Sequence, residues 1–183
     1  MRHAVRYTMM LAALTGAFAA GCDQAMHVTA GDAKLPANED SAAFLDRMSS
    51  TPAVSENDAA RGVLMLSGQQ PVETFGRRVE MLVARGMADK MWNFDASRPI
   101  TRGKLAYMVY QAANMSGGLM LTLTGPSQRY CLRELQYRQV MGPGTVISPV
   151  TGLELVAVLD RADRFRRTGY MPDQNVGLAE SPD

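Results

Sequence analysis

The sequence predicts a mainly α fold, a small bundle of helix–loop–helix pseudo-repeats with one short β element. Apolar residues recur at helical spacing along the central segments, and most of these segments begin at a residue suited to capping a helix. Two helix starts are also alike, because Ile100-Thr101 and Val150-Thr151 repeat at an offset of fifty residues with aligned apolar positions after them. Together these patterns indicate a helical unit that is used more than once.

The first 21 residues predict a removable export signal. Arg2 and Arg6 precede an apolar run from Met9 to Ala20, and small residues lead into Cys22. The run is shorter than the roughly 20 residues that a membrane-spanning helix needs. We therefore expect the mature chain to begin near Cys22.

The same stretch, Ala19-Ala20-Gly21-Cys22, resembles a bacterial lipoprotein signal, with Ala19 where that family usually has leucine. The resemblance implies a lipid on Cys22 and attachment to the cell membrane or outer membrane, facing the periplasm or the exterior. The alternative is an ordinary signal peptide that contains a cysteine.

The predicted elements of the body follow in order. Residues 22–51 are rich in Ala, Asp and small polar residues, which is typical of a flexible tether, although a short helix over 42–48 is compatible with them. Ser55 and Asp58 then form a near capping box. Phe75, Val79 and Leu82 lie on one stripe of a second helix, which ends near residue 86.

Thr101 caps the next helix, in which Leu105 faces inward. The segment 119–125, LMLTLTG, alternates in part and predicts the short strand. A further helix follows Pro126, and Thr151 with Glu154 forms a capping box that opens the last helix. We expect one domain over 52–165 and a loose tail over 166–183.

The amino-acid composition excludes several classes of partner and of catalytic or metal site. Without Arg2 and Arg6, 17 of the 19 Lys+Arg residues remain against 18 Asp+Glu, so a nucleic-acid partner is not expected. Both histidines, His3 and His27, precede the body, which excludes His-based nucleophile activation and His-based zinc sites there. We expect no cofactor, no metal and no catalytic residue. Cys131 is either a small buried residue or a thiol available to a partner.

One motif resembles a known family. Val79-x-x-Leu82-x-x-x-Gly86-Met87 is followed by Phe94 and by Arg98-Pro99-Ile100-Thr101-Arg102, an order similar to the S-layer homology repeat. The resemblance covers about 74–115 well, about 127–165 weakly, and 54–67 as a half-repeat. It implies helix–loop–helix units, usually three, in a pseudo-threefold bundle that binds cell-wall polysaccharide or peptidoglycan. Departures are Ala96 in place of proline, Lys104 in place of an acidic residue and Gly152 in place of arginine.

The resemblance makes Arg102 a candidate glycan contact, with Arg98 and Trp92 beside it in the same loop. An arginine at a helix start can bind an anionic sugar substituent, but it can equally form a surface ion pair. Trp92 can stack on a sugar or cover the core between two helices. The sequence thus predicts an envelope lipoprotein that binds glycan or scaffolds the envelope, with a protein–protein adaptor or a carboxylate-dependent cell-wall hydrolase as alternatives.

The anchor gives the first test. Cys22→Ser is expected to release the protein from the membrane fraction or to leave its signal uncleaved, because the residue that would carry the lipid is gone. Fractionation of cell extracts, with the size of the processed chain read on a gel, measures both. Unchanged membrane association together with normal processing would contradict lipidation at Cys22.

Overall fold

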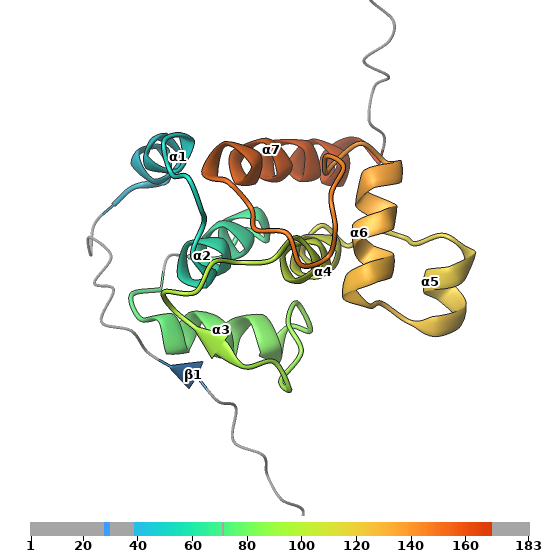
Figure 1. The fold of residues 1–183 in the computed structure, drawn as a ribbon, viewed down its shortest axis with the longest axis horizontal. Coiled ribbons are helices and arrows are strands. Elements are labelled where there is room, and N and C mark those ends of the chain that lie inside the picture. The colour runs from blue at the N-terminus through green and yellow to red at the C-terminus, as the bar shows by residue number, and fades with distance from the viewer. Residues whose placement is uncertain (1–27, 30–38, 71, 170–183) are drawn as a thin grey trace, which may run out of the picture.

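The fold is seen in a computed structural model that describes residues 28–29, 39–70 and 72–169, so the signal segment, Cys22 and most of the tail lie outside the described residues. The described part is mainly helical, as predicted (Figure 1). Its elements are β1 (Val28–Thr29), α1 (Ser41–Ser49), α2 (Glu56–Leu66), α3 (Phe75–Ala84), β2 (Phe94–Asp95), α4 (Arg102–Ala112), α5 (Leu119–Thr124), α6 (Gln128–Tyr137) and α7 (Gly152–Thr168).

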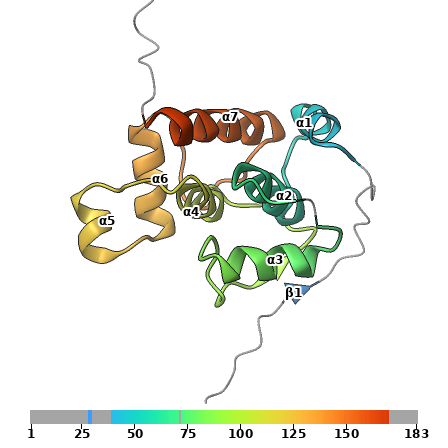
Figure 2. The same ribbon diagram turned by 180° about the vertical axis from the view of Figure 1, so that it is seen from behind.

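Six of the helices form three helix–loop–helix units: a first unit of α1 and α2, a second of α3 and α4, and a third of α6 and α7. The second helix of each unit begins at a hydroxyl cap, Ser55, Thr101 or Thr151, whose side chain accepts the backbone N–H three residues later. In Figures 1 and 2, α2 and α4 lie between a layer of α1 and α7 and a layer that contains α3.

The three helix starts meet in a closed ring of backbone hydrogen bonds. The backbone N–H of Glu56, the first residue of α2, donates to the Arg98 carbonyl at 2.8 Å. The backbone N–H of Arg102, the first residue of α4, donates to the Ser148 carbonyl at 2.9 Å. The backbone N–H of Gly152, the first residue of α7, donates to the Thr51 carbonyl in the first unit, also at 2.9 Å. Each unit therefore donates to the loop of the next, and the third closes on the first.

The residue before each cap lies at the centre of this ring. Val54, Ile100 and Val150 are all fully buried, and backbone bonds join Val54 to both of the others. Leu105 and Leu155 are also fully buried in one core, which confirms that the helices starting at Thr101 and Thr151 occupy equivalent places. Burial of these apolar side chains stabilises the bundle.

The folded body begins earlier than residue 52. Asp40 caps α1, and Phe44 and Met48 on this helix are fully buried against the core. Glu39 lies just before α1 and forms ion pairs with Arg47 and with Arg61 of α2. The predicted tether over 22–51 therefore ends by residue 39, because its last part supplies the first helix of the first unit.

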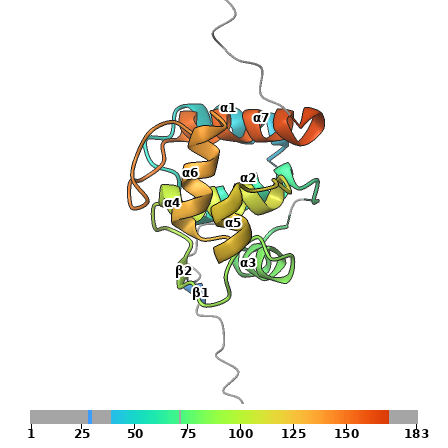
Figure 3. The same ribbon diagram turned by 90° about the vertical axis from the view of Figure 1, so that its right-hand side faces the viewer.

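The predicted strand over 119–125 is wrong, because this segment forms α5. An isolated strand among helices would leave its backbone groups without partners, whereas a helix satisfies them internally. Leu121 of α5 is buried in the core, while Met120 and Leu123 are exposed. The β element is instead β1 with β2, a parallel pair in which Val28 is aligned with Phe94 (Figure 3). At the other end, α7 runs past Phe165 to Thr168.

Substitutions in α7 test the packing. Leu155→Ala, like Leu105→Ala, is expected to lower the free energy of unfolding by about 2–5 kcal/mol, because each removes a fully buried side chain. Leu153→Ala is the matched control, since Leu153 is 66% exposed, and should change it by less than about 0.5 kcal/mol. Denaturant titration measures all three, and equal losses at Leu153 and Leu155 would contradict the packing.

Gly152→Ala tests the ring directly. A Cβ at this position would lie 1.8 Å from the backbone oxygen of Met48, which cannot move aside as a flexible side chain can. We expect a loss of about 3 kcal/mol or more in the free energy of unfolding. A variant as stable as the parent would show that α1 does not close on α7.

Candidate functional site

The ring brings the first residue of the second helix in one unit beside the third residue of the second helix in the following unit. At the junction of the first and second units, Glu56 pairs with Lys104 at 2.7 Å. At the junction of the second and third units, Arg102 pairs with Glu154 at 2.8 Å, with the charges reversed. The third junction has Gly152 at the first position and no such pair.

The Glu56 carboxylate is the centre of the first junction. It is 2% exposed and accepts from Lys104 Nζ at 2.7 Å, from Arg98 Nε at 3.0 Å and from the backbone N–H of Asp95 at 2.8 Å. The hydrogen bond to Glu56 raises the pKa of Arg98. Arg98 also donates to the Asn93 carbonyl, so the structure uses this candidate glycan contact to hold its own loop.

Trp92 covers the same junction. Its ring is half-buried and packs edge-on against Tyr107, with centroids 5.2 Å apart, and beside Phe94 at 5.9 Å. Lys104 Nζ lies 5.8 Å from the Trp92 ring centroid. These contacts fit the interpretation of Trp92 as a cover for the core between two helices.

Arg102 is also held inside the fold. Its Nη1 donates to the Gly142 carbonyl at 2.9 Å, and its side chain is only 15% exposed. The guanidinium lies against Gly144, where an added Cβ would come within 2.7 Å of it. Burial raises the pKa of Glu154, and the nearby Arg102 charge opposes that rise. Arg102 therefore neutralises Glu154 and anchors the loop before α7.

A hollow of about 410 Å³ with both polar and apolar lining adjoins this anchored loop. It lies between α6 and α7 and is lined by Gln136, Gln139, Met141, Gly142, Pro143, Gly144 and Arg161. Gln136 Nε2 donates to the carbonyls of Gly142 and Gly144, at 3.2 and 3.1 Å. Arg161 donates to the Gln139 carbonyl at 3.4 Å, a long bond that leaves most of its donors unused.

Sequence reasoning missed this hollow, because its lining comes from two helices and a loop that meet only in the fold. The available signal was the Pro- and Gly-containing loop 142–149, which breaks the chain between two helices. Between α6 and this loop, Gln139 adopts a positive φ of 57°, a left-handed conformation that is uncommon for residues other than glycine.

A second hollow, of about 530 Å³, lies among α1, α2 and α7 and is mainly apolar, with Asp160 and Asp163 at its edge. Asp160 pairs with Arg164 at 2.8 Å, and Asp163 pairs with Arg166 at 2.9 Å. The hydrogen bond from Arg166 holds the pKa of Asp163 below its usual range. A general acid needs a raised pKa, so this arrangement does not suit the acid of a carboxylate-dependent hydrolase.

Cys131 is fully buried, and burial raises the pKa of its thiol to about 12, so it is a protonated core residue. Across 39–70 and 72–169 no cluster of three or more His, Cys, Asp or Glu side chains is placed to hold a metal ion. No helix in the described residues has both the length and the hydropathy to cross a bilayer. No protein-family model, curated protein or solved structure matches this chain.

The pairing of Arg102 with Glu154 predicts a pH-dependent effect. Arg102→Ala is expected to lower the free energy of unfolding at pH 7 by about 1–3 kcal/mol, because it leaves a half-buried carboxylate unpaired. The loss should shrink as the pH falls towards 4.5, since Glu154 already has a raised pKa and becomes neutral more readily without Arg102.

Thermal and denaturant unfolding from pH 4.5 to pH 7 measure this effect. Arg164→Ala is the control, because its partner Asp160 is exposed and the pair is worth about 0–1 kcal/mol. A loss for Arg102→Ala that is equally large at both pH values would contradict the role given to Glu154.

Proposed function

We propose that this protein is an envelope lipoprotein, anchored through Cys22, whose body binds cell-wall polysaccharide or peptidoglycan non-covalently. The observation that carries the proposal is the hollow between α6 and α7, whose loop wall at Gly142 is held by Arg102. Its volume of about 410 Å³ falls in the usual range for small-molecule sites.

The chemistry of the lining suits a sugar. Sugar hydroxyls both donate and accept, and the side-chain oxygens of Gln136 and Gln139 accept while Arg161 donates. Pro143 and Met141 add apolar surface of the kind that can lie against the carbon-bound face of a ring. An acidic substituent would find a charged partner in Arg161, whose guanidinium can form a paired contact with a carboxylate.

The ring of three helix starts supports the resemblance to S-layer homology repeats, because that family is expected to pack three units around a pseudo-threefold axis. The first unit, of which the sequence indicated only half, is complete in the structure once α1 is included. Fold resemblance by itself does not establish a function, so the proposal depends on the hollow.

The role proposed for Arg102 is therefore to position the loop and not to contact the glycan. Arg102 donates to the Gly142 carbonyl and lies against Gly144, and Gln136 donates to the carbonyls of both glycines. These bonds preorganise one wall of the hollow before a ligand arrives, which lowers the cost of binding.

Binding to purified sacculi tests the proposal. Arg161→Ala is expected to weaken binding at least tenfold while leaving the melting temperature nearly unchanged, because within the described residues Arg161 makes a single, long hydrogen bond. Arg164→Ala, one turn further along α7 and outside the hollow, is the matched control and should bind as the parent does. Sedimentation with sacculi of known concentration measures all three.

A parent protein that does not bind sacculi would overturn the proposal and leave the adaptor alternative. Equal binding by Arg161→Ala and the parent would show that the glycan does not occupy this hollow.

A further inference from the structure

The helix α5 is an insertion between the second and third units, and it projects from the bundle beyond α6 in Figures 1 and 2. It joins α4 to α6, whereas the corresponding link between α2 and α3 contains no helix. Two of its apolar side chains face outward, since Met120 is 51% exposed and Leu123 is 70% exposed.

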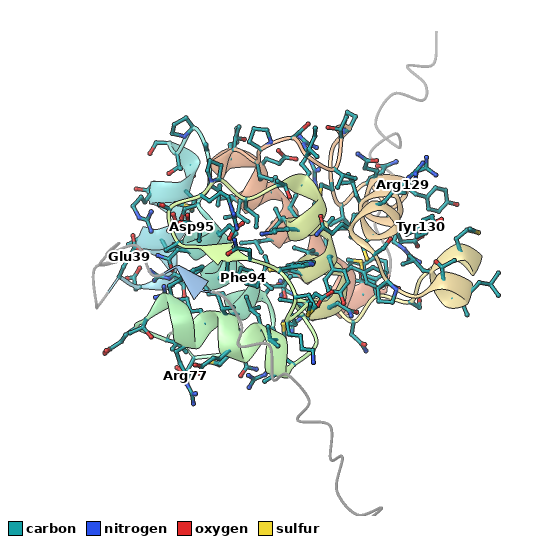
Figure 4. All side chains as sticks on the ribbon, turned by 60° about the horizontal axis from the view of Figure 1, so that its bottom comes forward. Glu39, Arg77, Phe94, Asp95, Arg129 and Tyr130 are labelled. Carbon is teal, nitrogen blue, oxygen red and sulfur yellow. The ribbon has the colours of Figure 1, made fainter. Side chains whose placement is uncertain are left out.

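The neighbouring face of α6 extends this surface, because Met120 of α5 lines one hollow together with Arg133 and Tyr137 of α6. Arg129, Arg133 and Tyr137 are spaced four residues apart, so they lie along one side of the helix, and all three are exposed. Tyr137 is 85% exposed. Figure 4 places Arg129 and Tyr130 at the end of the molecule that carries α5. We name Met120, Leu123, Arg129, Arg133 and Tyr137 the α5–α6 face.

The two arginines of this face are unpaired cations. Within the described part of the chain, neither Arg129 nor Arg133 forms an ion pair or a hydrogen bond through its side chain. The nearby carboxylate of Glu134 is already paired with Arg138 at 2.7 Å. The face therefore combines a projecting apolar tip, an aromatic side chain and two available positive charges.

We propose that the α5–α6 face docks on a membrane surface of anionic phospholipid. Met120 and Leu123 enter the boundary between headgroups and acyl chains, Tyr137 lies at headgroup level, and Arg129 and Arg133 bind lipid phosphates. Amphipathic segments with apolar and aromatic residues on one side and arginines beside them bind membrane interfaces in this way.

The size of the face favours a lipid surface over a protein partner. A stable protein interface buries at least about 1,000 Å² in total and takes roughly 20–30 residues from each partner, many more than the five residues of the α5–α6 face. A membrane needs no such complementary surface, and a lipid anchor would keep the body close enough for weak contacts to act. The face shares no residue with the lining of the hollow between α6 and α7, so this inference does not depend on glycan binding.

The experiment uses the mature chain, residues 22–183, carrying Cys22→Ser so that no acyl anchor contributes. It is sedimented with vesicles of phosphatidylcholine alone and with vesicles containing phosphatidylglycerol. We expect binding to be at least ten times stronger to the anionic vesicles and to weaken as salt is added, because the arginines act on surface charge.

Two further variants and their matched controls separate the parts of the face. Leu123→Ser should reduce binding at least fivefold, whereas Leu153→Ser, at a position exposed to 66% on α7, should not. Arg129→Ala with Arg133→Ala should remove the preference for anionic lipid. Arg77→Ala with Arg164→Ala removes two exposed cations elsewhere, with the same change in net charge, and should keep that preference.

Circular dichroism checks that each variant is folded, which is expected because every altered side chain is exposed. Equal binding of the parent to both kinds of vesicle, or equal loss in the variants and their controls, would overturn the proposal. Failure of the parent to bind vesicles, with an envelope protein captured by the parent and lost by Leu123→Ser, would also overturn it and assign the face to a protein partner.

Discussion

The closed ring of three helix starts is the constraint on which the rest of the structure depends. The first backbone N–H groups of a helix have no partner within the helix, and here each of α2, α4 and α7 finds one in a loop of another unit. Val54, Ile100 and Val150 fill the centre of the ring. Because each unit supplies an acceptor to one neighbour and a donor to the other, no unit can complete its own polar groups alone.

The ring also explains why three equivalent positions carry unlike residues. Where Glu56 begins a helix, Lys104 faces it from the next unit, and where Arg102 begins one, Glu154 faces it. Either arrangement neutralises the junction, so the sign of the charge is free to change while the pair is kept. At the third junction the Met48 backbone occupies the space, and only the missing side chain of Gly152 lets α1 close on α7.

Sequence patterns that span a few residues predicted the helix caps and the buried faces of the helices. The caps at Ser55, Thr101 and Thr151 were predictable because a cap acts within four residues, and Leu105 and Leu155 because helical periodicity marks the buried face. The sequence could not reveal the partners of Arg98 and Arg102, since their carboxylates lie 42 residues before and 52 residues after them in the chain. A short helix over 42–48 was compatible with the sequence, but its polar composition hid the place of Phe44 and Met48 in the core. The helix α5 was predicted as a strand because residues 119–125 alternate in part.

In this molecule the residues of the ring stabilise the fold, and recognition is assigned to residues outside it. Charges at the junctions neutralise one another and hold loops, so a ligand that drew Arg102 away would expose Glu154 to the cost of an unpaired carboxylate. Recognition is therefore better served by groups outside the ring, whose loss leaves its hydrogen bonds intact. Arg161, on the outer part of α7, meets this condition, and so does α5, which lies in the connection between two units. An insertion there adds surface without altering any donor or acceptor of the ring, so new contacts can arise at that site while the bundle keeps its stability.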